Sequence, residues 1–429
     1  MNLLNHFSML SKIRTIIMTL LLSATTLSSA AGDTDDSDVR ETPQMDFSYD
    51  EADSIPSFIK LDSNHIIMNG ADWSDLIQKL AAADSNTVTI VHIGDSHIQA
   101  DFATGKTRAL LQSRYGSAGR GLIVPLKIAG TNEPRDYAIK STSKWQASKL
   151  LKPDGKASIG FTGIGISPVD EKADLTIATL SRSGDAEPFS ALKIYHLGKL
   201  MIDSVSSSDE AISFSATYTD SVTTLLLPSP VTQVTIGFTT TCATSIYGIV
   251  LSNGRQGGIL YHAIGNNGAT FHSYNMLPDD INRTGDISPD LIIVSLGANE
   301  AFSRMTGDEI YRSIDRFIAN LRKNRPDCNI LLTTPMECQK SVLIRRKGKK
   351  RRRSYSVNEK VATVRDIILK YAADHNVPVY DWYEVAGGTG ASGSWVKEGL
   401  MAKDHIHHSY KGYRLHGSLL YDALINSTR

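Results

Sequence analysis

The chain has 429 residues, of which 45 are basic and 45 acidic, so it carries no formal net charge. Hydrophobic residues make up 41% of the sequence, which is enough for a sizeable buried core, and the length indicates two or three domains. The balanced charge argues against a nucleic-acid-binding protein, because such proteins usually carry an excess of basic residues.

The N-terminal segment has the features of a secretory signal peptide. In residues 1–30, basic residues precede the apolar run TIIMTLLLSA, and small residues then permit cleavage near Ala30 or Ala31. We therefore expect a secreted or periplasmic protein, with a retained N-terminal anchor as the alternative. Residues 31–55 are acidic and poor in apolar side chains, which predicts a disordered leader.

Apolar runs alternate with amphipathic segments on both sides of the middle region. The apolar runs, which predict buried parallel strands, are residues 86–93, 290–297, 329–335 and 377–383. The amphipathic segments, which predict helices, are residues 308–324 and 358–376. This alternation predicts an α/β fold with a doubly wound, mainly parallel sheet, built from residues 56–127 and 251–429.

The middle region, residues 128–250, has almost no helical periodicity. Its short runs alternate apolar and polar residues between turn residues, as in VTQVTIGF with Val234, Ile236 and Phe238, and in AISFSATY at 211–218. Such a pattern is typical of an all-β sandwich. We therefore expect an inserted β-sandwich that interrupts the α/β domain.

The sequence GDSH follows the first predicted strand directly. Ser96 would open a helix at the carboxyl edge of the sheet, where ligands of open α/β sheets bind and where a helix start favours an oxyanion. A serine hydroxyl needs a histidine to take its proton and an acceptor to orient that histidine. Taken alone, Ser96 could equally be a helix N-cap, and Asp95 and His97 read as supporting residues.

The C-terminal sequence KDHIHHSYKGY contains a possible partner pair. Asp404 lies three residues before His407, which is close enough for its carboxylate to accept a hydrogen bond from the imidazole. His405 and His408 lie beside this pair, so a metal site is the alternative interpretation.

Two further segments contain candidate oxyanion donors. Asn299 follows the buried strand at 290–297, and its amide could donate to a developing oxyanion. Gly268, in AIGNNGATF, has no side chain to prevent its backbone N–H from approaching the same point. Each of these segments, considered singly, is better explained as a tight turn.

Together, these blocks resemble the SGNH or GDSL hydrolase superfamily. In chain order they are Gly94-Asp95-Ser96-His97, Gly268, Gly297-Ala298-Asn299-Glu300 and Asp404-His405-Ile406-His407. The resemblance implies a serine esterase with Ser96 as nucleophile, His407 as general base and Asp404 as its orienting acid. It places the oxyanion hole at the Ser96 and Gly268 N–H groups and the Asn299 side chain, and it implies neither a cofactor nor a metal. Glu300 replaces the commoner Asp and is expected to support the turn.

Within the superfamily, the chain is most similar to exported peptidoglycan or polysaccharide O-acetylesterases. The likeness rests on GDSH followed by IQAD, on a β-region similar to a carbohydrate-binding module, and on residues 387–400, where Trp395 could stack on a sugar. The expected partner is thus an acetylated glycan. The alternatives are a lipase, thioesterase or acyltransferase of the same fold, or a non-catalytic glycan-binding protein; the intact Ser96, Asp404 and His407 argue against the last.

Two features remain outside this interpretation. Residues 345–353 are almost all basic, which predicts either a flexible solvated loop or a contact with an anionic polymer or surface. The three cysteines, Cys242, Cys328 and Cys338, give no disulfide framework. Buried thiols are expected, with a Cys328–Cys338 bridge as the alternative.

Overall fold

The computed structural model describes residues 55–181, 186–241, 243–344 and 352–428. The predicted signal peptide, nearly all of the acidic leader, Cys242 and most of the basic block lie outside these ranges. None of the helices within them combines the length and the apolar character that crossing a bilayer requires.

A six-stranded mixed sheet forms the centre of the α/β part. Its strands are, in spatial order, β1 (Ile66–Ile67), β20 (Val379–Tyr380), β17 (Asn329–Thr333), β16 (Leu291–Ser295), β2 (Thr87–Gly94) and β15 (Gly258–Gly265). All neighbours pair in parallel except β1 and β20, which are antiparallel. The predicted parallel strands therefore exist. The strand β15 was not predicted, although it extends the sheet beyond β2.

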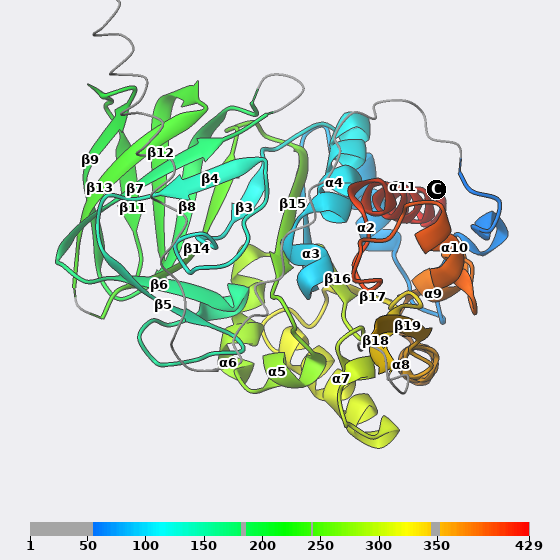
Figure 1. The fold of residues 1–429 in the computed structure, drawn as a ribbon. Coiled ribbons are helices and arrows are strands. Elements are labelled where there is room, and N and C mark those ends of the chain that lie inside the picture. The colour runs from blue at the N-terminus through cyan, green and yellow to red at the C-terminus, as the bar shows by residue number, and fades with distance from the viewer. Residues whose placement is uncertain (1–54, 182–185, 242, 345–351, 429) are drawn as a thin grey trace, which may run out of the picture. The chain divides into compact units, whose positions relative to one another are not determined.

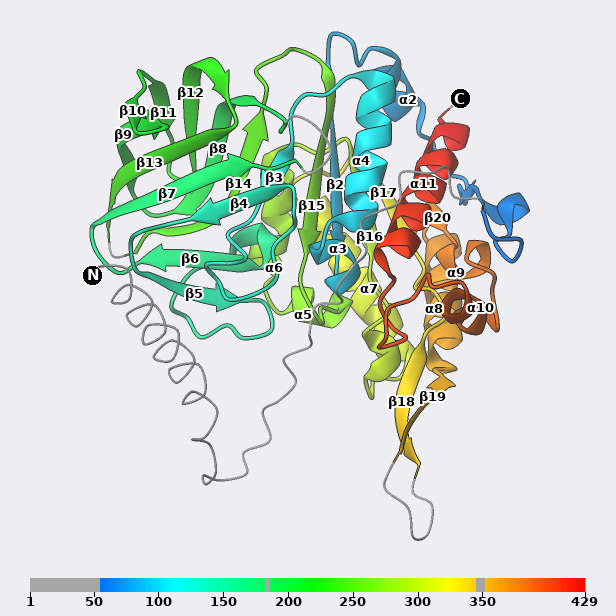
Figure 2. The same ribbon diagram turned by 45° about the horizontal axis from the view of Figure 1, so that its top comes forward.

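Helices cover both faces of this sheet (Figures 1 and 2), as expected for a doubly wound fold. The long helices α4 (Phe102–Tyr115) and α11 (Tyr410–Ser427) lie on one face, and α7 (Gly307–Arg322) and α8 (Lys360–Asp374) lie on the other. The remaining helices are α2 (Ser74–Ala81), α3 (Ser96–Gln99), α5 (Phe271–Asn275), α6 (Pro278–Asn282), α9 (Trp382–Val385) and α10 (Ala391–Lys397). Short 3₁₀ segments are η1 (Leu61–Ser63), η2 (Gly160–Thr162), η3 (Arg283–Ile287) and η4 (Glu300–Phe302).

Helix α7 shows how the sequence determines where a helix begins and which of its faces is buried. Thr306 caps its first turn by accepting from the Glu309 N–H, and Glu309 reciprocates in a capping box. The predicted apolar stripe, which includes Ile310, Ile314 and Phe317, is fully buried against the core. The corresponding stripe of α8 is also buried, so both amphipathic helices are confirmed.

Two antiparallel sheets occupy the sequence between α4 and β15. One contains β10 (Glu210–Ala211), β9 (Leu200–Ser207), β13 (Gln233–Thr240), β7 (Lys172–Thr179) and β4 (Tyr137–Lys140). The other contains β11 (Ser215–Tyr218), β12 (Val222–Val231), β8 (Phe189–Leu197), β14 (Ser245–Ser252), β6 (Ile164–Pro168) and β5 (Trp145–Lys149), with β3 (Gly121–Ile123) paired to β14. The Trp145 and Phe238 rings, one from each sheet, lie 6.1 Å apart, so these faces pack together.

The alternation in β13 gives the expected burial, whereas the alternation at 211–218 does not. Val234, Ile236 and Phe238 are buried between the sheets. Phe214 and Tyr218 are exposed: Tyr218 lies in β11, an edge strand, and Phe214 lies in the segment that joins β10 to β11. Cys328 and Cys338 are buried free thiols, so the bridge between them is not formed.

Candidate active site

The candidate site lies where three parallel strands end at the same level. Gly94, the last residue of β2, pairs with Gly265 of β15 on one side and with Ser295 of β16 on the other. The segments that follow these three residues therefore leave the sheet together. They contain Ser96, Gly268 and Asn299, which were predicted to meet at this edge.

Two glycines allow the short helix α3 to lie close to the strand ends. A Cβ on Gly94 would lie 2.7 Å from the Ser295 carbonyl oxygen, and one on Gly265 would collide with the Gln99 backbone. Any larger residue at either position would push α3, and Ser96 with it, away from the sheet.

Ser96, His407 and Asp404 form a continuous hydrogen-bonded relay. The Ser96 hydroxyl lies 2.7 Å from His407 Nε2, and His407 Nδ1 lies 2.6 Å from Asp404 Oδ2. Because a carboxylate only accepts, His407 carries its proton on Nδ1, and Nε2 is free to accept from Ser96. This is the arrangement that an activated serine nucleophile requires.

The loop around Asp404 holds the carboxylate in its ionised form. Asp404 Oδ1 accepts hydrogen bonds from the Ile406 and His407 N–H groups, at 2.9 and 3.0 Å. Burial alone would raise the pKa of Asp404, but these bonds and the neighbouring His407 hold that pKa well below its usual range. Asp404 is therefore charged whenever His407 needs an acceptor.

The candidate oxyanion donor Asn299 is bound to Asp95. Its Nδ2 donates to Asp95 Oδ2 at 2.9 Å and to the Ala269 carbonyl at 3.0 Å. Asp95 also accepts from the His97 N–H at 2.9 Å, which caps α3. Burial raises the pKa of Asp95 to about 6, against these bonds and the nearby His407. Asp95 thus holds the turn. Both Nδ2 hydrogens of Asn299 are used in its two bonds, so donation to an oxyanion requires that one of them be released.

Gly268 lies in the adjacent loop and has a backbone φ of +79°, which favours glycine. Its neighbour Asn267 donates its N–H to Gln99 Oε1 at 2.8 Å, so the loop is fastened to α3. A Cβ on Gly268 would lie 2.9 Å from the Leu151 side chain of the antiparallel region. The oxyanion roles of Ser96, Gly268 and Asn299 remain predictions that rest on this shared position.

Glu300 is fully buried directly after Asn299. Its Oε1 accepts from the Phe271 N–H at 2.7 Å, at the start of α5, while Oε2 has no partner among the described residues. Burial raises the pKa of Glu300 to about 7. The side chain therefore joins the Asn299 turn to α5, which agrees with a turn-supporting role.

The three neighbouring histidines occupy different environments. His97 packs its ring 5.1 Å from the His407 ring, and its Nδ1 lies 3.1 Å from the Tyr413 hydroxyl. Burial lowers the pKa of His97 to about 3. His408 is buried with its ring 5.3 Å from that of His97, whereas His405 bonds to Gln339 through its Nδ1. No group of three or more histidine, cysteine or acidic side chains suited to a metal occurs in the described ranges.

A hairpin of β18 (Gln339–Ile344) and β19 (Arg352–Val357) holds the loop that carries Asp404. Tyr355 stacks on the His405 ring at 3.8 Å, and its hydroxyl donates to the Lys403 carbonyl at 2.9 Å. His405 Nδ1 donates to Gln339 Oε1 at 2.7 Å. Residues 345–351, most of the basic block, connect the two strands and lie outside the described residues.

The expectation that Trp395 stacks on a sugar is wrong. Its side chain has 0% exposure, and its Nε1 donates to the Ala386 carbonyl at 2.8 Å. The ring packs edge-on against Trp382, with centroids 5.7 Å apart. Trp395 is thus a core residue that supports the loop before Asp404.

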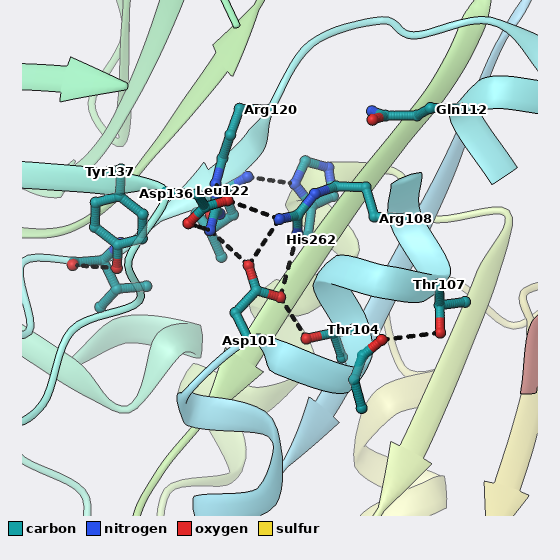
Figure 3. Close-up of polar contacts among 12 residues, drawn as sticks. Asp101, Thr104, Thr107, Arg108, Gln112, Arg120, Leu122, Asp136, Tyr137 and His262 are labelled. Atoms are coloured by element: carbon teal, nitrogen blue, oxygen red, sulfur yellow. Dashed lines mark hydrogen bonds and ion pairs between the residues drawn. The ribbon is translucent and has the colours of Figure 1, made fainter. Parts of the chain in front are cut away.

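A largely buried ion-pair network begins at Asp101, two residues after α3 (Figure 3). Asp101, at the start of α4, accepts from Arg108 and Arg120, and both arginines also bind Asp136 next to β4. Two carboxylates and two guanidinium groups balance the charge. The network therefore fastens the helix segment that carries Ser96 to the antiparallel region.

Sequence reasoning missed the residues that join these parts. Gln99 Nε2 donates to Thr131 Oγ1 at 2.9 Å and to Asn132 Oδ1 at 2.8 Å, and Asn267 Nδ2 donates to the same Asn132 oxygen at 2.7 Å. The position of Gln99, three residues after Ser96 on the same short helix, was the signal that could have indicated it.

Part of the chain is similar to a known protein family. Residues 240–415 match the family model described as the GDSL-like Lipase/Acylhydrolase family. That range includes Asn299, Asp404 and His407 but not Ser96, which precedes the antiparallel sheets. No curated protein sequence matches the chain.

Among solved structures, one described as a peptidoglycan O-acetylesterase is 22% identical, with a TM-score of 0.65, over 85% of this chain and 97% of that one. A lipase/acylhydrolase from Enterococcus faecalis is 19% identical, with a TM-score of 0.29, over 40% of this chain and 77% of its own. An acetyl xylan esterase is 17% identical, with a TM-score of 0.30, over 39% and 81%. The first of these shows the same fold.

Proposed function

We propose that the chain is an ester hydrolase of the SGNH type and that it removes O-acetyl groups from an exported glycan of the peptidoglycan class. The observation that carries the proposal is the relay from Ser96 through His407 to Asp404, at 2.7 and 2.6 Å. A solved structure of the same fold is described as a peptidoglycan O-acetylesterase, which supports this substrate class.

The reaction follows from the positions of these side chains. Ser96 Oγ attacks the acetyl carbonyl carbon as His407 Nε2 takes the hydroxyl proton. The imidazolium is stabilised by Asp404, which stays ionised. The negative charge that develops on the carbonyl oxygen would be met by the Ser96 and Gly268 N–H groups, each donor worth roughly 3 kcal/mol. Asn299 would join them once its Nδ2 releases the Asp95 or the Ala269 oxygen.

Attack by Ser96 gives a tetrahedral intermediate. When it collapses, the bond between the acetyl carbon and the sugar oxygen breaks, and His407 gives its proton to that oxygen. A water molecule then attacks the acetyl group on Ser96 and gives its proton to His407. The ester bond to Ser96 breaks, Ser96 Oγ recovers the proton, and acetate leaves. These reaction steps need no electron transfer and no cofactor.

The two antiparallel sheets, predicted at residues 128–250, would act as a glycan-binding module inserted into the hydrolase. Leu151 beside Gly268, and Asn132 bound to Gln99, support this role, because both place the region next to the candidate site. Residues 1–30 would export the protein to the compartment in which such a polymer occurs.

Acetate release from a panel of O-acetylated glycans, including peptidoglycan, tests this proposal. We expect release from the polymer by the wild-type protein and none by a Ser96→Ala variant. Preference for long-chain esters would instead indicate a lipase. Acetyl transfer to an added alcohol without acetate release would indicate an acyltransferase, and binding without turnover would indicate a non-catalytic glycan-binding protein.

A further inference from the structure

An open groove of about 840 Å³ lies on the outer side of the five-stranded sheet. Its floor is the face of β4, β7 and β13 that points away from the other antiparallel sheet, with small side chains such as Ala138, Thr176 and Ala178. Its wall is the loop at residues 127–135, which precedes β4. A smooth floor beside a polar wall is suited to an extended polymer chain.

The charged side chains that line the groove are mainly cationic. They are Lys127, Arg135 and Lys140, with Glu133 as the one carboxyl group among the lining residues. Burial raises the pKa of Glu133 to about 7, so only part of its population is charged at neutral pH. The groove therefore carries a net positive charge, although the whole chain is neutral.

The wall of the groove is held rigidly on its inner side. Asp136, which follows the wall directly, binds Arg108 and Arg120 at 2.8 Å each (Figure 3). The next residue, Tyr137, donates its hydroxyl proton to the Val124 carbonyl at 2.9 Å. Because these bonds already fix the wall, a bound polymer would order little additional structure.

The same wall reaches the candidate active site. Thr131 and Asn132 both line the groove and both accept hydrogen bonds from Gln99, on the helix that begins with Ser96. Asn132 also accepts from Asn267, which precedes Gly268. A polymer that lies in the groove thus contacts the residues that position the nucleophile and one candidate oxyanion donor.

From the cationic lining and its bonds to the active-site loops, we propose that this groove binds carboxylate groups of an anionic glycan while an acetyl group of the same polymer reaches Ser96. Lys127 and Lys140 would supply the charge. The inference rests on the proposed function and narrows its substrate to polymers that carry carboxylates. Holding the polymer in this way raises the effective concentration of its acetyl groups at Ser96.

The test measures binding separately from turnover. A Ser96→Ala chain is sedimented with insoluble O-acetylated peptidoglycan, and with the same material after its carboxylates have been converted to neutral amides by carbodiimide coupling. We expect amidation to weaken binding about tenfold at low ionic strength, and added salt to weaken binding to the untreated polymer. A Lys127→Glu/Lys140→Glu version should bind weakly and lose the preference for the untreated polymer, because it replaces two positive charges by two negative ones.

Lys199→Glu provides the matched control, since Lys199 is an exposed lysine in the turn between β8 and β9 and is not among the residues that line the groove. That variant should keep the wild-type preference for the untreated polymer. The inference is overturned if the double lysine variant still prefers untreated peptidoglycan as strongly as the parent chain does. Hydrolysis of a small acetyl ester by the wild-type protein is measured in parallel, so a failure of the proposed function is distinguishable from a failure of the groove.

Discussion

At the scale of single residues, substitutions in the Ser96–His407–Asp404 relay should affect catalysis and stability separately. Ser96→Ala removes the nucleophile and leaves the His407–Asp404 bond in place. We expect hydrolysis of a small acetyl ester to fall by at least about a thousandfold, because a triad without its nucleophile retains only residual catalysis. The thermal midpoint should change little, since Ser96 is only half-buried. Near-normal turnover by this variant would exclude the mechanism.

His407 and His408 are adjacent, yet we expect replacement of His407 to abolish activity and replacement of His408 to lower stability. His407→Ala should be as inactive as Ser96→Ala while remaining folded. His408→Ala should lower the free energy of unfolding, because its ring is buried 4.8 Å from that of Trp395, while the folded fraction still turns over esters. Rate and denaturation measurements on both variants separate these effects. Inactivation of the wild-type enzyme by chelators would instead favour a metal site.

The sequence was sufficient to predict the relay but not its surroundings. Asp404 and His407 are three residues apart, so their contact is local and their spacing indicates it. Asn299 and Asp95 are 204 positions apart, and only the register of β2 with β16 brings them together. Trp395 was misplaced for a related reason: an aromatic residue in a polar segment gives no sign of whether other elements will cover it.

At the scale of elements, the β18–β19 hairpin should matter for turnover. His405 has a φ of +59°, which is unfavourable for a non-glycine residue, and Tyr355 and Gln339 hold it there next to Asp404. Tyr355→Ala should lower kcat on a small ester about tenfold with little change in KM, because Asp404 loses its fixed position. Tyr355→Phe keeps the stacking and should lose less. Equal kcat for Tyr355→Ala and wild type would show that the loop with Asp404 keeps its conformation without the Tyr355 contact.

The ion-pair network should be important for stability. Arg120→Met leaves Asp101 and Asp136 to share one guanidinium group in a buried setting, which should cost about 3–5 kcal/mol of unfolding free energy. Denaturant titration measures this loss. The exposed pair Lys156–Asp154 is the control, and Lys156→Met should change the free energy of unfolding far less, because solvent screens this pair. A similarly small effect of Arg120→Met would mean that water replaces the lost partner.

Most elements of the α/β part could be predicted because their patterns are local. A run rich in β-branched residues identified β2, near-continuous apolar runs identified β16 and β17, and the helical stripes identified α7 and α8. Strand β15 was missed because Tyr261 and His262 interrupt its apolar run. These polar groups are accommodated by distant partners: the Leu122 N–H donates to His262 Nδ1 at 3.0 Å, and the Tyr261 hydroxyl lies 2.7 Å from His92 Nδ1.

At the scale of the whole molecule, buried ionisable groups set the dependence of stability on pH. Burial lowers the pKa of six histidines, which are His92, His97, His196, His262, His408 and His416. Below a pH of about 6.5 these side chains take up protons in the unfolded chain before they do so in the folded one, so acidification favours unfolding. Each of them contributes up to about 1.4 kcal/mol per pH unit.

Three buried carboxyl groups act in the opposite sense. Burial raises the pKa of Asp95 to about 6 and those of Glu133 and Glu300 to about 7. In the folded protein they take up protons at a higher pH than in the unfolded chain. Their stabilising effect is therefore complete below the unfolded pKa, near 4, and is lost as the pH rises through 6 to 7.

The balance between these two sets gives the final prediction. From pH 7 to about 4.5 the carboxyl groups offset part of the histidine effect, so the free energy of unfolding should fall gently. Below about pH 4.5 the unfolded carboxyl groups are protonated as well, and the histidines act unopposed until about pH 3, where His92, His97 and His262 accept protons in the folded state. Urea titrations at intervals of half a pH unit should therefore show the steepest loss between about pH 4.5 and 3. In Glu300→Gln one opposing carboxyl is removed, so the loss between pH 7 and 4.5 should become steeper by up to about 1.4 kcal/mol per pH unit. An unchanged slope in that variant would mean that Glu300 is ionised in the folded protein.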